Sequence, residues 1–99
     1  MLNIGKTIEG GNISFALEGR LDTITAPDLD RELKAVLPDA TVLTLDFGKL
    51  EYISSAGLRV LLSTQKSMAK QGKMTITHVN ETIMDIFDVT GFIDILTIE

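Results

Sequence analysis

The chain has 99 residues, of which 44% are hydrophobic, and its formal net charge is −5. This length and apolar content suit one domain with its own core and argue against a disordered protein. The negative charge argues against nucleic acid and anionic membrane surfaces as partners, because both recruit clustered Lys and Arg side chains, and the absence of cysteine excludes disulfides and thiolate chemistry.

No targeting segment is expected. The first residues, MLNIGKTIEGGN, lack the apolar run of a signal peptide. The longest uncharged apolar runs are far shorter than the roughly 20 residues of a membrane-spanning helix. We therefore expect residues 1–99 to form a single cytoplasmic domain.

The first part of the chain predicts a β-hairpin. In NISFALEG, the apolar residues Ile13, Phe15 and Leu17 alternate with small or polar ones, which is the period of a strand with one buried face. A looser apolar alternation precedes them, and the glycines of EGGN at 9–12 are typical of a tight turn.

The next segment, TAPDLDRELKAVL, changes to helical spacing, with Leu29 and Leu33 on its apolar face. Thr25 is expected to cap the N-terminus of this helix, Pro27 is tolerated in its first turn, and Pro38 marks its end.

A central strand and a second helix are expected to follow. The run VLTLDF at 42–47 is almost wholly apolar, which is typical of a strand covered on both faces. From Ser54 or Ser55 a helix is expected to extend to about Lys70, with Gly72 after its end. Its predicted buried stripe consists of Leu58, Leu61, Leu62, Met68 and Ala69. Its predicted exposed basic face consists of Arg59, Ser63, Lys66 and Lys70.

The last third of the chain predicts a strand, a helix and a final strand. KMTITHV alternates as a strand, and its single histidine, His78, is expected to pack at the strand end. NETIMDIFDVTG is expected to form a helix capped by Asn80 and ended by Gly91. FIDILTIE is expected to form the last strand. The predicted order β-β-α-β-α-β-α-β implies an α/β fold with a parallel or mixed sheet.

Two loops are expected to lie together beyond the ends of the strands, GRLDTIT and GKLEYISSAG. The second loop carries a serine pair, Ser54 and Ser55, at the start of the second helix. One of these hydroxyls would cap the helix, which is worth about 1 kcal/mol. A cap requires only one hydroxyl, so the second serine, followed by the small residues Ala56 and Gly57, also suits display for modification. The residues alone leave both readings open.

Enzymatic and metal chemistry find little support in the sequence. ISSAG matches only half of the hydrolase motif G-x-S-x-G, and the only base in reach of such a triad would be His78. No phosphate-binding glycine motif follows a strand, and no cluster of ligand residues has metal-site spacing. We therefore expect no catalysis, no cofactor and no metal.

The segments EGRLDTITAPDL and DFGKLEYISSAGLRVLL resemble the STAS domain of bacterial anti-sigma factor antagonists, also called anti-anti-sigma factors. The likeness extends over nearly the whole chain, including DVTGF after the third predicted helix. It implies the STAS fold, a mixed β-sheet with flanking helices, and no catalysis.

The resemblance also implies a function. In the unphosphorylated form, family members bind an anti-sigma factor that is also a serine kinase, and this frees a sigma factor. The kinase uses ATP and magnesium to phosphorylate the serine two positions before the motif glycine, which here is Ser55 before Gly57; a phosphatase restores binding. The partner-binding residues expected on this basis are Asp22, Thr23, Ser54, Ser55, Gly57, Leu58 and Arg59.

The sequence departs from the family pattern at Ser54, where many members have aspartate, and it ends where many members continue into a last helix. The alternative function is a constitutive STAS scaffold or a small-ligand sensor domain in a signalling complex. A small unrecognised enzyme ranks third.

Overall fold

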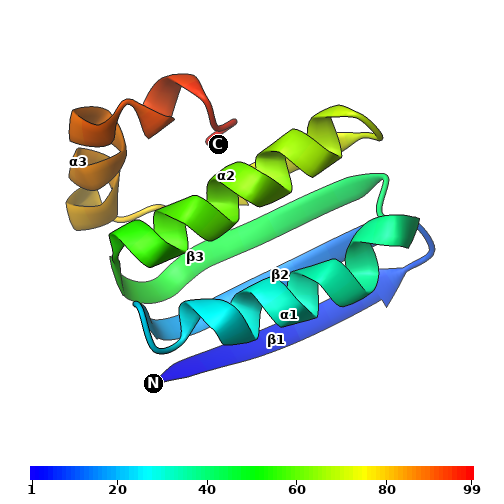
Figure 1. The fold of residues 1–99 in the computed structure, drawn as a ribbon, viewed down its shortest axis with the longest axis horizontal. Coiled ribbons are helices and arrows are strands. Elements are labelled where there is room, and N and C mark those ends of the chain that lie inside the picture. The colour runs from blue at the N-terminus through cyan, green and yellow to red at the C-terminus, as the bar shows by residue number, and fades with distance from the viewer.

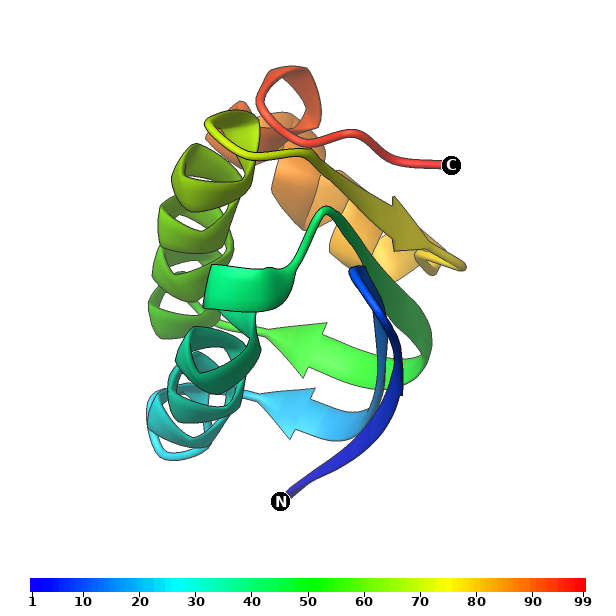
Figure 2. The same ribbon diagram turned by 90° about the vertical axis from the view of Figure 1, so that its right-hand side faces the viewer.

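A mixed four-stranded sheet in the order β1-β2-β3-β4 carries three α-helices, in a computed structural model that describes all 99 residues (Figures 1 and 2). The elements are β1 (Leu2–Glu9), β2 (Asn12–Leu21), α1 (Ala26–Val36), β3 (Val42–Ile53), α2 (Ser55–Ala69), β4 (Lys73–Thr77) and α3 (Glu81–Thr90), with short 3-10 helices at Leu37–Asp39 and Phe92–Asp94. No helix has the length and apolar character to cross a membrane.

The predicted hairpin is confirmed. β1 and β2 pair antiparallel, and the pairing of Glu9 with Asn12 leaves only Gly10 and Gly11 in the turn. Gly10 has a φ of 62°, in the left-handed region that glycine adopts without steric cost. β2, β3 and β4 then pair parallel, with α1 and α2 as the crossovers between them.

The sheet is covered by helices on one face only, as the side view in Figure 2 shows. Along β3, Leu43, Leu45 and Phe47 are fully buried against the helices, whereas Val42 is exposed and Asp46 is half-buried on the other face. The prediction that VLTLDF is covered on both faces is therefore wrong. The two crossover helices, α1 and α2, both lie on the buried side of the sheet and leave the other face open.

β3 is longer than predicted. It continues from Phe47 to Ile53, so most of the expected loop GKLEYISSAG is strand. Its second half pairs with the end of β2 after register shifts near Ala16 and Gly19. These irregularities keep β2 and β3 paired to their last residues, and the true connection between β3 and α2 is only Ser54.

The α2 helix begins and ends where the sequence predicts. Leu58, Leu61 and Met68 are buried as expected, but Leu62 is half-buried and Ala69 is exposed, so the predicted stripe was drawn too wide. At about 100° per residue, both residues lie at the edge of the stripe centred on Leu61. The four residues of the predicted basic face, Arg59, Ser63, Lys66 and Lys70, are all exposed.

The C-terminal segment is not the predicted strand. Asn80 caps α3 by accepting a hydrogen bond from the backbone of Ile83, and Gly91 ends it with a φ of 80°, both as expected. A 3-10 helix then occupies Phe92–Asp94, and only an isolated parallel bridge between Ile98 and Ile76 remains of the strand. In this segment Leu96 is buried and Phe92 and Ile98 pack partly buried against the core, whereas Ile93 and Ile95 are exposed.

Candidate functional site

The two predicted loops do lie together, where β2 and β3 end side by side. Leu21 pairs with Ile53 as the last residues of the two strands, and the backbone N–H of Ser54 donates to the carbonyl of Leu21 at 2.9 Å. This contact joins the start of α2 to the segment that leads into α1. The convergence follows from the parallel pairing of β2 and β3, since parallel strands end at the same edge of a sheet.

Asp22 organises the first of these segments. Its carboxylate accepts from the backbone N–H groups of Ile24 and Thr25, each at 3.0 Å, and from the Thr25 hydroxyl at 3.2 Å. The pKa of Asp22 lies below its ordinary value, first because of the hydrogen bond from the Thr25 backbone, then through the Thr25 hydroxyl and the Ile24 backbone. These bonds hold the segment in one conformation.

Thr25 occupies the predicted N-cap position of α1, but its hydroxyl does not cap the helix. It donates instead to the carbonyl of Arg20 at 2.8 Å and accepts from the backbone of Asp22 at 2.9 Å. Thr25 is buried and its hydroxyl bridges backward to the strand end, while the Asp22 carboxylate holds the backbone of Ile24 and Thr25 just before α1.

The two serines differ in environment. Ser54 is the N-cap residue of α2 with an extended backbone, yet its hydroxyl makes no cap hydrogen bond and is buried without a partner. Ser55 is the first residue of the helix and is exposed. The predicted cap hydrogen bond is thus absent, and Ser55 is the hydroxyl that faces solvent.

Gly57 and Leu58 belong to the interior. A Cβ added at Gly57 would lie 2.7 Å from Leu21 Cγ and 2.8 Å from Ile53 Cγ1, so the helix start packs directly on the two strand ends. The space that the small residue was expected to leave open is filled. Leu58 is only 7% exposed, and its side chain supports α2 from the core instead of facing a partner. Of the expected partner-binding residues, Thr23, Ser55 and Arg59 are exposed, and Asp22 and Ser54 are half-buried.

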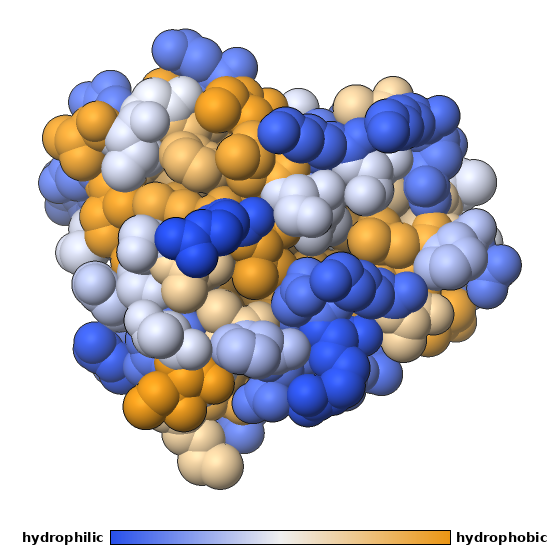
Figure 3. All heavy atoms as spheres, viewed as in Figure 1, coloured by the Kyte–Doolittle hydropathy of each residue, from blue (hydrophilic) through white to orange (hydrophobic).

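Sequence reasoning missed Ile24, which is 84% exposed in the segment that Asp22 holds. Figure 3 shows an orange apolar area at the loop before α1, separate from the larger apolar area over α2 and α3. The signal that could have indicated it is an isoleucine between two threonines in a polar loop, where no strand or helix period explains its presence.

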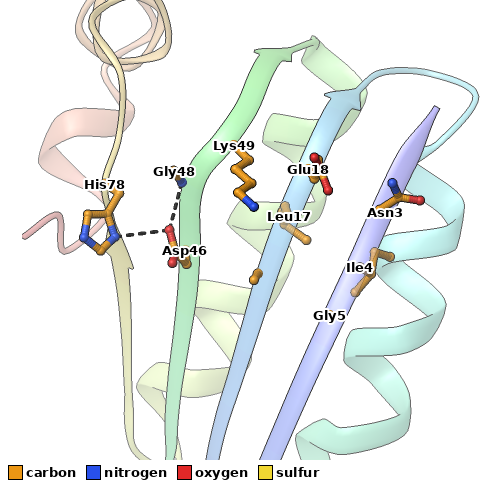
Figure 4. A pocket seen from close by; sticks show the side chains of 10 residues that line it. Asn3, Ile4, Gly5, Leu17, Glu18, Asp46, Gly48, Lys49 and His78 are labelled. Carbon is orange, nitrogen blue, oxygen red and sulfur yellow. Dashed lines mark hydrogen bonds and ion pairs between the residues drawn. The ribbon is translucent and has the colours of Figure 1, made fainter.

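A second polar group lies on the uncovered face of the sheet (Figure 4). His78 was expected to pack at the end of its strand, but its side chain is 71% exposed and its Nδ1 lies 3.1 Å from Asp46 Oδ1. It has a φ of 57°, in the left-handed region, which turns the chain away from β4 toward α3. Asp46 also accepts from the backbone N–H of Gly48 at 2.8 Å. Together with Lys49, these residues border a hollow of about 690 Å³.

The STAS domain family matches residues 3–99. The anti-sigma-B factor antagonist of Bacillus subtilis is 28% identical over 98 residues, which are 98% of this chain and 90% of that protein. An anti-sigma factor antagonist from Mycobacterium paratuberculosis has the same fold, with a TM-score of 0.89 and 21% identity over 99% of this chain and 85% of that one.

A further solved structure is the Bacillus cell fate determinant SpoIIAA in its phosphorylated form, with a TM-score of 0.75 and 15% identity over 100% of this chain and 91% of that one. Its likeness to this chain is one of fold. The family match, by contrast, extends over nearly every residue, including both segments at the strand ends. This chain belongs to the STAS domain family.

Proposed function

We propose that this protein is an anti-sigma factor antagonist, a binding module without catalytic activity of its own. In the unphosphorylated form it binds an anti-sigma factor that is also a serine kinase, and this releases a sigma factor. Phosphorylation of Ser55 prevents the binding, and a phosphatase restores it. The names of the relatives support the general function. The observation that carries the switch is the exposed Ser55 hydroxyl at the start of α2, beside a rigid loop.

The partner surface consists of exposed side chains around this hydroxyl. Thr23 and Ile24 come from the segment before α1, and Ser55 and Arg59 lie one helical turn apart on α2. Ile24 is the apolar centre of the group. An isoleucine that stands 84% exposed on a segment fixed by hydrogen bonds loses little conformational entropy on binding, so it suits an apolar pocket of the partner.

A phosphate on Ser55 acts on the complex and not on the fold. It adds about −1.5 to −2 charges at a helix N-terminus, where free N–H groups and the helix dipole favour an anion. In the complex the same group would be desolvated, at a cost of several kcal/mol unless a cation meets it. A penalty of about 3 kcal/mol weakens binding roughly a hundredfold.

The test is phosphorylation by the cognate serine kinase with ATP, followed by intact mass and binding measurements. One phosphate is expected on the parent protein and on Ser54→Ala, and none on Ser55→Ala, which should still bind the kinase. A phosphate that persists in Ser55→Ala contradicts the assignment, as does a Ser55-phosphorylated protein that binds as tightly as the parent.

The second candidate is a small-ligand sensor within a signalling complex, and the hollow on the uncovered sheet face favours it. Under that function the partner surface would respond to an occupant of the hollow. The two functions can be distinguished by Ser55→Ala, which abolishes regulation by phosphorylation but would leave regulation by a bound ligand intact.

A further inference from the structure

The uncovered face of the sheet carries a site that the switch does not use. The hollow of about 690 Å³ lies over β1, β2 and β3, on the side opposite α1 and α2, and its size suits a small ligand (Figure 4). Its charged side chains are Lys49, Asp46 and Glu18, with His78 at one border. Lys49 and Glu18 are neighbours across the β2–β3 pairing, yet neither forms an ion pair in the protein.

The charges of the hollow select against simple ions. Lys49 extends from β3 toward β2 at the hollow, so a ligand that carries only an ammonium group leaves this lysine without a partner. Two carboxylates border the same space, and the chain as a whole has a net charge of −5, so a simple anion is repelled. A zwitterion satisfies both signs, with its carboxylate on Lys49 and its ammonium on Asp46.

Asp46 is held ready for such a contact. One of its carboxylate oxygens, Oδ1, accepts from Gly48 N–H and lies against His78 Nδ1, which leaves Oδ2 without a partner within the protein. A carboxylate that two neighbours hold at one oxygen does not have to be ordered by the ligand, and this preserves binding energy. The left-handed backbone of His78 is the conformation that brings its ring to Asp46.

The floor of the hollow is formed by small residues, and a second hollow that adjoins it is lined by polar residues. Gly5 and Ala16, which pair directly across β1 and β2, offer nothing larger than a methyl group on this face. A second hollow of about 510 Å³ shares these residues and is bordered by the hydroxyl-bearing residues Thr7, Ser14, Thr44 and Thr77. We propose that this face binds a free α-amino acid, with its charged groups between Lys49 and Asp46 and a polar side chain toward the hydroxyls.

The ligand specificity is tested by titration of the ¹⁵N-labelled full chain, followed through its amide resonances. The probes are L-glutamine, L-alanine, propionate and ethylamine; the last two keep the alanine frame with only one of its charges. L-Glutamine should give saturable shifts at Gly5, Ala16, Gly48 and Lys49, and L-alanine weaker ones at the same amides. Propionate and ethylamine should bind at least about tenfold more weakly than L-alanine, because each loses a hydrogen-bonded charge.

Three variants test the position of the ligand. Lys49→Gln and Asp46→Asn should each weaken L-glutamine binding at least about tenfold. Gly5→Val should abolish it by filling the hollow; a Cβ there lies 3.8 Å from the Ala16 carbonyl, an ordinary contact, and valine is favoured in strands, so the fold is kept. The control is Lys66→Gln, on the exposed face of α2, which should bind like the parent protein.

The proposal is overturned if propionate binds as well as L-alanine, or if Lys49→Gln and Gly5→Val bind L-glutamine like the parent. It is also overturned if no probe gives saturable shifts up to about 20 mM, a concentration that would detect even millimolar affinity. None of these outcomes depends on phosphorylation of Ser55, so the proposed ligand site and the proposed switch are tested independently.

Discussion

Gly57 allows α2 to pack closely on the sheet, and the change in unfolding free energy of Gly57→Ala tests how close this packing is. The added Cβ would lie 2.7 Å from Leu21 Cγ and 2.8 Å from Ile53 Cγ1, and both neighbours are at most 1% exposed, so neither can move aside into solvent. Overpacking of such a core costs typically about 1–3 kcal/mol. Alanine in place of glycine inside a helix returns about 1 kcal/mol, so a net loss of up to about 2 kcal/mol is expected.

The assay is urea unfolding followed by circular dichroism, with the midpoint and the slope fitted together. Gly57→Val should lose at least about 3 kcal/mol, because a branched side chain meets both neighbours and fits a helix less well than alanine. Ser63→Ala, at an exposed position of the same helix, is the control for helix propensity and should gain a few tenths of a kcal/mol. A Gly57→Ala protein more stable than the parent would show that α2 does not pack this closely on Leu21 and Ile53.

Four further predictions follow from the site and the core. Ser55→Asp should weaken kinase binding strongly, while its unfolding free energy stays within about 0.5 kcal/mol of the parent, as urea unfolding will show. Leu61→Ala should lose about 2–5 kcal/mol in the same assay, since Leu61 is fully buried; a loss below about 0.5 kcal/mol would mean that another face of α2 is buried. Ile24→Ala should weaken partner binding at least about tenfold by calorimetry, whereas Val89→Ala, equally exposed on α3, should not; equal effects would remove Ile24 from the interface. The lowered pKa of Asp22 stabilises the fold above the ordinary carboxyl pKa of about 3.9, and this contribution is lost as the pH falls through the lowered native pKa. Asp22→Asn should therefore show a shallower acid-side decline of the urea midpoint, and an unchanged decline would contradict the assignment.

The sequence predicted those parts of the fold that short-range patterns determine. The hairpin, the three helices and the cap of α3 by Asn80 depend on periodicity and on residues only a few positions apart, and all are confirmed. The convergence of the segments around Asp22 and Ser55 was also predictable, since it follows from the parallel order of the strands alone.

The parts that failed depend on contacts between distant residues. The extension of β3 to Ile53 requires the register shifts of its pairing with β2, which no local pattern contains. The apolar alternation of FIDILTIE predicted a strand, but the left-handed end of α3 at Gly91 leads into a 3-10 turn instead. His78 was expected to pack because it continues an alternating strand, and only the fold shows that Asp46 is its partner.

The predictions about the site residues were wrong or incomplete for a similar reason. The sequence suggested a hydroxyl cap at Thr25 and another at Ser54 or Ser55, yet neither N-cap hydroxyl caps its helix, because that of Thr25 bridges to Arg20 and that of Ser54 is buried at the strand ends. The position of Ile24 between two threonines in a polar loop singles it out but does not decide its exposure, since a loop isoleucine is equally compatible with burial under a neighbouring element.

The pairing of β2 with β3 also determines when the site comes into existence during folding. Asn12 pairs with Val42 and Leu21 with Ile53, so the chain must close loops of 30 and 32 residues before the segments around Ser55 meet (42 − 12 and 53 − 21). Such non-local pairing forms more slowly than a helix or hairpin. A ribosome-bound chain therefore cannot present Ser55 in this setting until β3 has emerged and paired with β2, and a short peptide such as EYISSAGLRVLL lacks the rigid loop beside it. A kinase that reads this surface recognises a shape that exists only in the folded domain.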